Sequence, residues 1–383
     1  MSSVWEISNM PEFDSLKEDA KADVCIVGGG IAGIWAAYLL SKAGKSVVLI
    51  ESDKIGRAAT LYTTAFVTES LDTSYDELTK MFGEEASKLI ERSNQEAIVI
   101  IDRAIKDEGI DCEWTRLPVK IFKNMKDFKG TPDEEFANQG KYHPMKFLKG
   151  LAEAAVKNGA KIYESTEAGE IKSGDSVTVM TKSGHSITVS DVIVATYEPW
   201  NNPKPTHFKK GMYVSYVMAL ELPKGALDEG LYLDQHNPYH YVRIDDLGEK
   251  MRMIVGGEDH RAEISFEDKQ SFDALKQFIE KTFPNLPHKV TNKWQGGILE
   301  SSDGLALIGE YAPHEYVAAA FSGNGMTYAA ISARIITDLI TSNGSDYKEV
   351  YDPKRALKTG ALMHKFKDYA GEFFGGAVKN LFK

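Results

Sequence analysis

The sequence contains little cysteine, no long apolar run and no excess of positive charge. Its 383 residues include only two cysteines, Cys25 and Cys112, which are too few for a disulfide framework or a thiolate metal site. No window approaches the roughly 18 consecutive apolar residues that a membrane-spanning helix needs. The acidic N-terminus also lacks the basic start and apolar stretch of a secretory signal. We therefore expect a cytoplasmic globular protein and no metal site.

The net charge of −11 argues against general binding to nucleic acid. The charge is uneven, because residues 354–383 contain seven lysines and arginines against two acids. Apolar residues at spacings of three and four in this tail predict a basic amphipathic helix. Such a helix can lie on an anionic membrane, dock a partner protein or pack on its own domain. The sequence leaves these three possibilities open.

A glycine-rich turn follows the first strongly predicted strand. The apolar run Val24–Val27 is bounded by turn residues, which is typical of a buried strand. The sequence GGGIAG follows at 28–33, and a helix is predicted over 34–43. A second buried strand, predicted over 46–50, ends at Glu51. This order of strand, glycine turn, helix and strand is typical of a dinucleotide-binding fold.

Each residue of this motif has a mechanical reason. Gly28 allows the tight turn, Gly30 lets the backbone approach a pyrophosphate, and Gly33 lets the helix pack close to the strand. The free N–H groups at the helix start favour a phosphate, and Glu51 can accept hydrogen bonds from a ribose. The motif does not by itself separate FAD from NAD, and a glycine turn without a ligand is the alternative.

A second glycine turn near the C-terminus favours FAD. The segment 317–321 predicts a strand, Ser322–Gly325 a turn, and 326–339 a helix. The start of that helix would stabilise the negative charge that a reduced flavin carries near N1 and O2. A fold that binds only NAD does not need this second site. The alternative is a plain strand, turn and helix that close the sheet.

Further motifs carry a resemblance to a known family. The first glycine turn, followed by Ile55-Gly56 and by Tyr62–Ala65, resembles the D-amino-acid oxidase or glycine oxidase family of FAD-dependent oxidoreductases. Within it, the sequence is most similar to the branch that is often fused to a Rieske iron–sulfur domain. Other matches follow in the expected order: His143-Pro144, Asp191–Thr196, Tyr241–Arg243, Gly256–His260, Asp303–Gly309 and Ala320–Thr327.

The resemblance implies an α/β fold, with a doubly wound, Rossmann-like FAD-binding domain and a second α+β substrate domain on an antiparallel sheet. Tyr62 stands where some relatives attach FAD covalently through a histidine, so noncovalent FAD is implied. The sequence has no Cys-x-His set, so the Rieske module is expected to be absent. Together, the motifs and the resemblance imply cofactor contacts from Gly28, Gly30, Ile31, Ala32, Gly33, Glu51, Ser52, Arg57, Thr60, Thr63, Thr64, Ala65, Ala168, Ala195, Gly304, Gly323, Asn324, Gly325, Met326 and Thr327.

The sequence departs from the family pattern at three places. Tyr197 stands where the family usually has glycine, and Ala306 stands where proline is frequent. The loop Arg57–Thr60 replaces a run that is commonly rich in glycine. These departures concern the local geometry of the loops around the cofactor more than membership of the family.

The nucleotide domain is expected to be discontinuous, and a cap domain to fill the intervals. Residues 76–110 predict helices, and 213–222, 231–245 and 251–255 predict strands. A helix over 265–283 is expected to be capped by Ser265. The expected boundaries are 1–75, 141–205 and 291–352 for the FAD-binding domain, 76–140 and 206–290 for the substrate domain, and 353–383 for the basic tail.

The substrate side of the site is predicted from one strand. Tyr241 and Arg243 lie two residues apart, so in a strand they share one face. Arg243 could pair with a substrate carboxylate in a bidentate manner, and Tyr241 could form the wall beside it. The alternative is an exposed arginine beside a tyrosine that packs. His260 could be a base or a histidine fixed by hydrogen bonds in a turn.

Three functions remain open at this point. The first is an FAD-dependent oxidoreductase that oxidises a C–N bond of a small amine or amino acid by hydride transfer to flavin N5. Its electrons would pass to oxygen or to a separate redox protein. The second is a flavin-bearing subunit or scaffold that docks a protein partner, and the third is an NAD-binding protein without flavin. No nucleic acid partner is expected, and the tail allows peripheral membrane contact.

Overall fold

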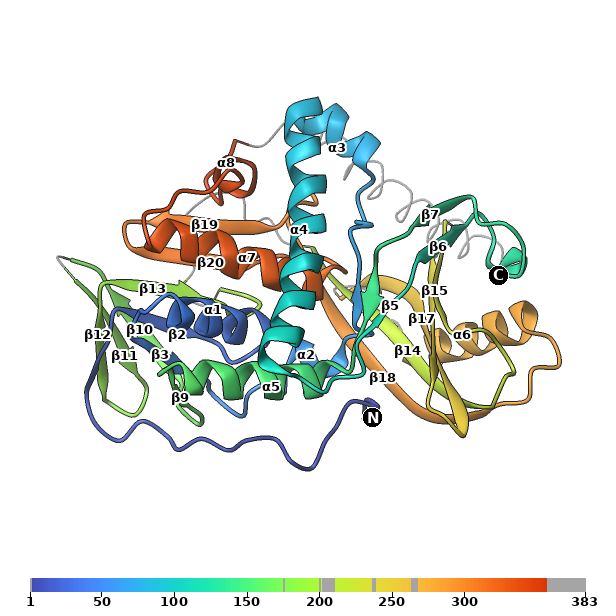
Figure 1. The fold of residues 1–383 in the computed structure, drawn as a ribbon, viewed down its shortest axis with the longest axis horizontal. Helices are drawn as coiled ribbons and strands as arrows, with labels where there is room; N and C mark the ends of the chain where they lie inside the picture. Colours follow the sequence, from blue (N-terminus) through green and yellow to red (C-terminus); the bar gives the residue numbers. More distant parts are fainter. Residues whose placement is uncertain are drawn as a thin grey trace, which may run out of the picture.

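The fold is described from a computed structural model of the chain. Two large sheets divide it into a six-stranded half and a seven-stranded half (Figure 1). Within the described residues, no helix combines the length and the apolar character needed to cross a bilayer. The residues that the structure describes are 2–174, 176–199, 201, 211–235, 239–262 and 268–356.

The six-stranded sheet has the order β19-β20-β13-β2-β3-β9. All neighbouring strands are parallel except β19 and β20. Its central strands are short, apolar and fully buried, because both faces of a parallel sheet are covered. The strands are β2 (Val24–Val27), β3 (Val47–Ile50), β9 (Lys161–Tyr163), β13 (Asp191–Val194), β19 (Leu307–Ala312) and β20 (Glu315–Ala319).

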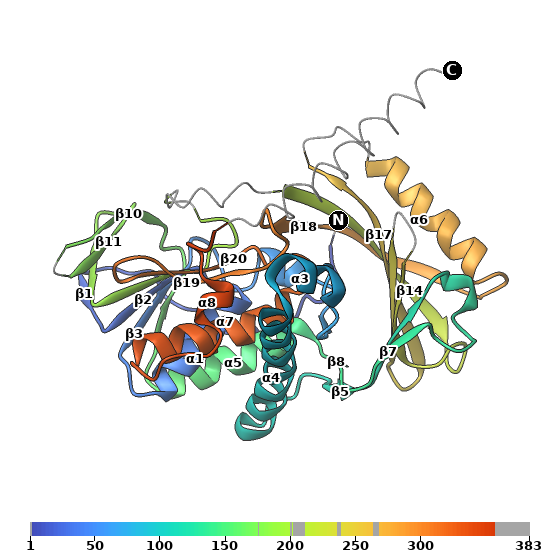
Figure 2. The ribbon, with the colours of Figure 1, turned by 90° about the horizontal axis from the view of Figure 1, so that it is seen from above.

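Helices cover one face of this sheet and a second sheet covers the other. Val24 and Ile26 point into the core that the helices share, whereas Cys25 and Val27 pack on the second sheet. The helices are α1 (Ile31–Lys42), α5 (Pro144–Lys157) and α7 (Gly325–Ile340), and the long helix α4 (Glu84–Glu108) crosses over them (Figures 1 and 2). The second sheet is formed by β1 (Ala20–Lys21), β12 (Ser186–Val189), β11 (Val177–Thr181) and β10 (Ala168–Lys172).

The seven-stranded sheet has the order β18-β14-β17-β16-β15-β6-β7, and only β15 and β6 pair in parallel. Helix α6 (Asp268–Thr282) packs on one face of it. The other face joins the core of the six-stranded half through Val217, Ala219 and Ile254. The strands are β6 (Val119–Phe122), β7 (Glu134–Phe136), β14 (Gly211–Pro223), β15 (Gly230–Asp234), β16 (His240–Asp246), β17 (Lys250–Arg261) and β18 (Lys289–Glu300).

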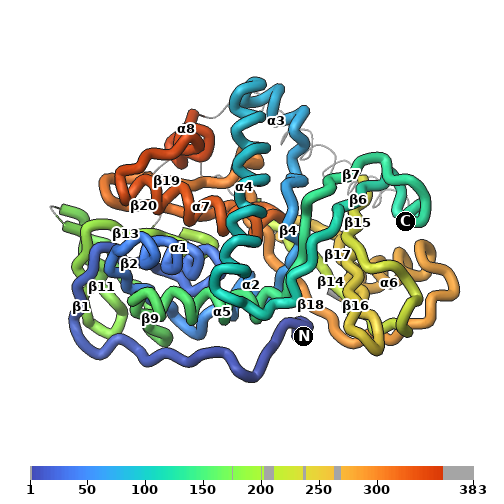
Figure 3. Tube along the Cα trace, in the orientation of Figure 1, coloured from blue at the N-terminus to red at the C-terminus, as the bar shows by residue number. Residues whose placement is uncertain are grey.

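Small elements connect the two halves. A three-stranded sheet of β4 (Phe66–Val67), β8 (Gly140–Lys141) and β5 (Thr115–Arg116) lies between them. The N-terminal segment runs along the six-stranded half and ends beside β18 (Figure 3), where Asn292 donates to Ser2 O at 3.2 Å. The remaining short elements are α2 (Ala59–Tyr62), α3 (Tyr75–Phe82), the 3₁₀ turn η1 (Met125–Asp127) and α8 (Lys348–Tyr351).

The expected fold class is confirmed, and most predicted elements are present with shifted ends. The strand predicted over 231–245 is two strands, β15 and β16. The predicted strand over 317–321 is β20, which begins and ends two residues earlier. The expected cap at Ser265 and nearly all of the basic tail lie outside the described residues.

The domain boundaries remain a proposal, which two packing observations amend. Most of β18 was expected in the FAD-binding domain, yet the strand pairs with β14 of the seven-stranded sheet. Helix α4 was expected in the cap, yet it packs on α7 and α5 of the six-stranded half. We propose that β18 belongs to the substrate domain and that α4 belongs to the FAD-binding domain.

Candidate functional site

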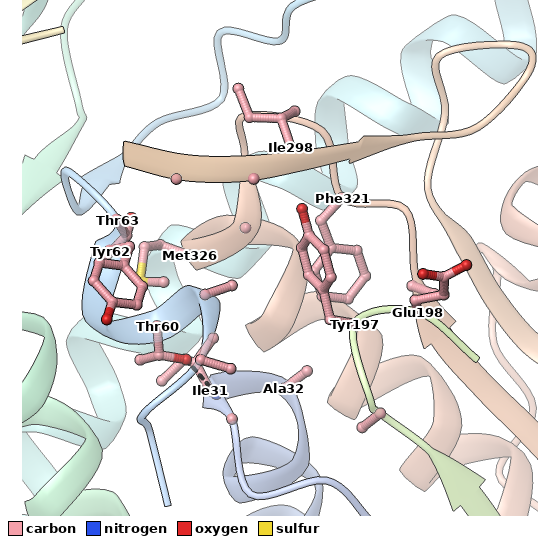
Figure 4. A pocket seen from close by; sticks show the side chains of 18 of the residues that line it. Ile31, Ala32, Thr60, Tyr62, Thr63, Tyr197, Glu198, Ile298, Phe321 and Met326 are labelled. Atoms are coloured by element: carbon pink, nitrogen blue, oxygen red, sulfur yellow. Dashed lines mark hydrogen bonds between the residues drawn. The ribbon is translucent and has the colours of Figure 1, made fainter. Parts of the chain in front are cut away.

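A cavity of about 570 Å³ lies between the two halves (Figure 4). One side of it is formed by residues at the carboxyl ends of the parallel strands, including Val27, Ile50 and Ala195. The other side is formed by Val217 of β14 and Tyr241 of β16. The crevice outside the carboxyl ends of the strands is where open α/β sheets bind their ligands.

The first glycine turn forms one wall of the cavity. Gly28 has φ +112°, and a Cβ there would lie 2.5 Å from Ala195 O. A Cβ at Gly33 would lie 1.9 Å from Gly28 O, so both positions require glycine. Helix α1 begins at Ile31, and Gly30, Ile31 and Ala32 line the cavity. The positive end of this helix is therefore presented to the cavity.

Glu51 follows β3 and lines the cavity beside this turn. Its Oε2 accepts from Gly29 N at 2.7 Å, and its Oε1 accepts from Asp53 N and Ser52 Oγ at 2.9 Å each. The carboxylate is thus fixed by its neighbours. Thr60 of α2 braces the same wall, because its Oγ1 accepts from Ile31 N at 3.0 Å.

The second glycine turn forms another wall. Helix α7 begins at Gly325, and the side chain of its N-cap residue Asn324 donates to Ser70 O at 2.7 Å instead of capping the helix. Gly323 N donates to Asp72 Oδ2 at 2.7 Å. Gly323, Asn324 and Gly325 all line the cavity, so two helix starts meet there.

Four residues in left-handed backbone conformations surround the cavity. Ala65 has φ +55°, Tyr197 +65°, Ala320 +58° and Ser322 +49°. Such conformations cost of order 1–3 kcal/mol in residues other than glycine and cluster at functional sites. Tyr197, whose ring stands against the cavity in Figure 4, occupies the position where the family usually has glycine. Its φ explains why glycine is common there.

The end of the cavity nearest the seven-stranded sheet is aromatic. It is lined by Phe66, Tyr239 and Tyr241, together with Ser215 of β14. The hydroxyls of Tyr241 and Ser215 are 2.9 Å apart and share a hydrogen bond. A Cβ at Gly256 would lie 2.0 Å from Tyr241 Cζ, so this glycine makes room for the ring. Burial raises the pKa of both tyrosines, which keeps them neutral.

Two aspartates lie at this aromatic end. Asp72 lines the cavity, and although the residue is exposed, protein atoms crowd its carboxylate and raise its pKa. Burial raises the pKa of Asp259 to about 7; the charges of Asp72 and Glu300 add to this, and a hydrogen bond with Ser215 and the charge of His240 oppose it. Among the residues that the structure describes, no hydrogen-bond donor reaches Asp259 Oδ1.

Arg243 does not reach the cavity. Its side chain is 1% exposed, and its Nε donates to Asp245 Oδ1 at 2.8 Å. Its Nη1 donates to the carbonyl oxygens of Thr64 at 2.8 Å, Ala65 at 3.1 Å and Tyr142 at 3.0 Å. Tyr241 and Arg243 share a strand face as expected, but the structure brings only Tyr241 to the cavity. Arg243 is also not the exposed residue of the alternative interpretation.

Arg243 belongs to a buried ionic cluster around Asp245. Lys141 Nζ lies 2.7 Å from Asp245 Oδ1, and Arg252 Nη2 lies 2.8 Å from Oδ2. Burial alone would raise the pKa of Asp245, but the charges of Arg243, Lys141 and Arg252 hold it well below its ordinary value. The carboxylate is therefore ionised and matched by three cations.

Trp5 of the N-terminal segment completes this cluster. Its ring is fully buried and stacks with the guanidinium carbons of Arg243 and Arg252, which lie 4.9 and 4.6 Å from the ring centre. Its Nε1 donates to Thr63 O at 2.6 Å. Trp5 and Arg243 therefore hold three successive carbonyls of the loop 63–65, part of which lines the cavity.

The structure brings most of the predicted cofactor residues together, while their contact with FAD stays a prediction. Those that do not line the cavity support it from behind or lie beside it: Gly33 packs on Gly28 O, Thr327 bonds Thr68, Gly304 lies against Thr73, Ala65 O accepts from Arg243, and Arg57 is exposed. Those that line it are Gly28, Gly30, Ile31, Ala32, Glu51, Ser52, Thr60, Thr63, Thr64, Ala168, Ala195, Gly323, Asn324, Gly325 and Met326.

Sequence reasoning missed Asp72, Ser215, Asp259 and the role of Trp5. Ser215 could have been found, because it alternates with Val217 on a predicted strand. A single aspartate in a loop and one tryptophan near the N-terminus give no such signal. His260, considered as a base, is bonded to Tyr216 Oη at 3.0 Å and to Arg261 O at 2.9 Å, which is the fixed histidine of the alternative.

Comparison with known proteins places these features in a family. The family model "FAD dependent oxidoreductase" (DAO) matches residues 23–134 and 131–339. The chain is 30% identical to the putative Rieske 2Fe-2S iron–sulfur protein YhfW of Bacillus subtilis, over 92% of this chain and 75% of that protein. It is 24% identical to gamma-glutamylputrescine oxidoreductase of Escherichia coli, over 88% and 87%. The structure of L-proline dehydrogenase from P. horikoshii superposes with a TM-score of 0.72 at 19% identity, over 88% and 98%.

Proposed function

Because the chain belongs to the DAO family of FAD-dependent oxidoreductases, we propose that it oxidises a C–N bond of a small amine or amino acid. The observation that supports this most directly is the single cavity that joins two glycine turns at one end to Tyr239 and Tyr241 at the other. Relatives named for an amine and an amino acid substrate favour the same bond type.

The walls of the cavity fit FAD. Gly28 and Gly33 allow the turn and α1 to pack tightly on their neighbours, which brings the backbone at Gly30 and the positive start of α1 to the cavity wall. We propose that Gly28, Gly30 and Ile31 hold the diphosphate and that Glu51 holds the adenosine ribose. The start of α7, with Gly325 and Met326, would face the flavin ring.

FAD, when bound, supplies the acceptor for the hydride that leaves the substrate carbon. The ammonium form of the substrate first gives one proton to water, and the lone pair of the neutral nitrogen then forms the double bond of the iminium product as the hydride leaves. The chain's own part is to orient this carbon and to exclude water. Phe66, Tyr239 and Tyr241 supply the apolar walls for that task, and Ser215 and Tyr241 offer hydroxyls to the nitrogen.

The flavin is proposed to be noncovalent. Tyr62 lines the cavity at the position of the histidine that some relatives use for attachment, and no histidine or cysteine is among the described residues that line it. Acid precipitation should therefore release all flavin absorbance into the supernatant.

The test of the proposed function is anaerobic reduction of the flavin. The purified protein should be yellow, and its absorbance near ~450 nm should bleach when the correct amine or amino acid is added without oxygen. Bleaching by none of a broad panel of amines and amino acids would count against C–N oxidation. Hydrogen peroxide formed in air would identify oxygen as the acceptor.

A second candidate is a flavoprotein that passes electrons to a separate redox protein. It is favoured by the match to a relative named as a Rieske protein, of which this chain covers 75%. In that case the substrate would bleach the flavin without forming peroxide, and reoxidation would be fast only with an added iron–sulfur protein. Fast reoxidation by oxygen alone would remove this candidate.

A further inference from the structure

We infer that the substrate is a cationic amine without a carboxylate on the carbon that is oxidised, rather than an α-amino acid. This inference rests on the proposed function and narrows it from two substrate classes to one. It depends on which charged groups face the aromatic end of the cavity and on which basic groups are already paired with other residues of the protein.

The aromatic end has an acid and no base among the described residues that line it. The one basic side chain among the described lining residues is Lys182, which pairs with Glu167 at 2.5 Å. This pair lies beside Glu51, because the neighbouring Thr166 N donates to Glu51 O at 2.8 Å. Lys182 is therefore at the first glycine turn. Asp72 accepts from Gly323 N of the second glycine turn and is close enough to raise the pKa of Tyr239 and Tyr241, so it is the acid that lies beside the aromatic end.

Three basic groups of the adjoining strands are paired with other residues away from the cavity. Arg243 donates to Asp245 and to three backbone carbonyls, Arg252 pairs with Asp245 and stacks on Trp5, and Lys141 pairs with Asp245 and Glu229. Freeing Arg243 for a substrate carboxylate would leave Asp245 and those carbonyls without their donors. A buried carboxylate without its partners costs several kcal/mol, so this exchange is unfavourable.

Asp259 adds negative character behind the cavity wall. A register shift in the pairing of β14 with β17 sets Ser215 opposite Glu258 and Asp259, and Glu258 has φ +57°. The carboxylate of Asp259 therefore meets Ser215, whose hydroxyl also contacts Tyr241 on the cavity wall. The Oδ1 of Asp259 has no hydrogen-bond partner among the described residues, and the charges of Asp72 and Glu300, which oppose its ionisation, are offset only in part by His240.

A cation beside the aromatic end would be attracted by Asp72 and by Asp259 behind the wall, whereas a substrate carboxylate there would be opposed by both acids and would find no described arginine or lysine side chain to pair with. Opposite charges within about 4–6 Å favour the ionised form of a carboxylate, and like charges disfavour it. An ammonium group beside Asp72 would therefore favour the ionised forms of Asp72 and Asp259 and would be attracted by them. An α-carboxylate at the same place would be repelled, because tyrosine and serine hydroxyls compensate a charge only in part.

The test uses matched pairs that differ by one carboxylate: pyrrolidine and proline, putrescine and ornithine, dimethylamine and sarcosine. Flavin reduction of the holoenzyme is followed anaerobically in a stopped-flow instrument. We expect the amine of at least one pair to give a limiting rate divided by Kd at least 100-fold above that of its amino acid. Faster reduction by the amino acid overturns this inference alone. Bleaching by no member of any pair overturns the proposed function, and this inference with it.

Variants of the two acids separate charge from shape. Asp72→Asn should raise the Kd of the reducing amine at least tenfold, because it removes the charge that holds the ammonium form of the substrate; the limiting rate is recorded beside it. Asp259→Asn should raise the Kd by a smaller factor. Glu221→Gln, an acid of β14 that pairs with Lys250 away from the cavity, is the matched control and should change neither value. An unchanged Kd in Asp72→Asn contradicts the inference.

Discussion

Two aspartates on neighbouring strands of one sheet have opposite environments. Asp245 lies at the end of β16 and Asp259 near the far end of β17, so the two are at opposite ends of a paired ladder. Asp245 is surrounded by three cations that lower its pKa. Asp259 has two other acids near it and a pKa raised to about 7.

The difference separates a structural site from one that is open to a ligand. The Asp245 cluster satisfies its own charges and, through Arg243 and Trp5, fixes the loop 63–65 beside the glycine turns. Asp259 has an oxygen without a donor among the described residues. Buried polar groups are normally paired, so the unpaired oxygen of Asp259, behind the wall at Ser215 and Tyr241, gives this end of the cavity a negative character that a cationic ligand would offset.

Asp245→Asn is expected to have the largest effect on stability. It removes the negative charge that balances Lys141, Arg243 and Arg252, and breaking a buried pair in this way costs roughly 3–5 kcal/mol. The free energy of unfolding, measured in urea with saturating FAD, should fall by that amount at pH 8. A loss below 1 kcal/mol would contradict the structural role.

The pH dependence sharpens this prediction. The folded pKa of Asp245 is below its unfolded value of about 4, so its contribution is fully present above that pH. It is lost as the pH falls through the folded pKa. The difference in the free energy of unfolding between the natural protein and Asp245→Asn should therefore become smaller only at acidic pH.

Asp259→Asn is expected to change stability in the opposite direction. The folded pKa of about 7 exceeds the unfolded value of about 4, so the folded state holds the proton longer, and stability falls as the pH rises between these values. The variant should therefore be more stable than the natural protein at pH 8, by about 1–3 kcal/mol. The difference should vanish toward pH 4. A destabilised variant at pH 8 would show that Asp259 is paired.

Trp5→Phe should have a smaller effect that reaches the cavity. It keeps a ring between the two guanidinium groups but loses the bond to Thr63 O, which is worth about 1–1.5 kcal/mol. Because Thr63 belongs to the cavity loop, the Kd of the apoprotein for FAD, measured by quenching of flavin fluorescence, should rise about threefold to tenfold. This fold-change corresponds to roughly 0.7–1.4 kcal/mol.

Trp35→Phe is the matched control for that variant. Trp35 is also fully buried, in α1, but among the described residues its Nε1 has no hydrogen-bond partner. Its replacement should leave the Kd for FAD unchanged. Equal effects of the two variants on this Kd would mean that the bond to Thr63 has no special role.

The six-stranded half could be predicted from the sequence because its signals are local. Gly28, Gly33 and Glu51 lie within one strand–helix–strand unit, and each has a steric or polar requirement that spacing alone reveals. The left-handed conformation of Tyr197 was marked by a departure from the family pattern. The separation of β15 from β16 was missed, because the apolar and aromatic residues of 231–245 fit a single strand.

The substrate side could not be predicted, because its geometry arises from pairing between distant segments. Alternation correctly put Tyr241 and Arg243 on one face, but the cavity ends between them, where Thr64 and Ala65 close over Arg243. The position of Asp259 depends on a register shift against β14. Neither feature has a sequence signal within its own strand.

Ser215→Ala is expected to have the smallest effect, and it tests whether Asp259 is coupled to the cavity wall. An ionised carboxylate can only accept hydrogen bonds, so Ser215 donates to Asp259 and accepts from Tyr241. Losing this donor should raise the pKa of Asp259 above 7 and cost about 1 kcal/mol at pH 8. The pH above which the stability difference between the natural protein and Asp259→Asn stops growing is set by the folded pKa of Asp259, and it should move upward by the same shift when both carry Ser215→Ala. Ser332→Ala, which removes a buried hydroxyl bonded to Ala329 O within α7, should lose comparable stability without moving that pH. An unmoved pH in Ser215→Ala would mean that Asp259 titrates independently of the hydroxyl chain, and the wall and the acid would then be separate parts of the site.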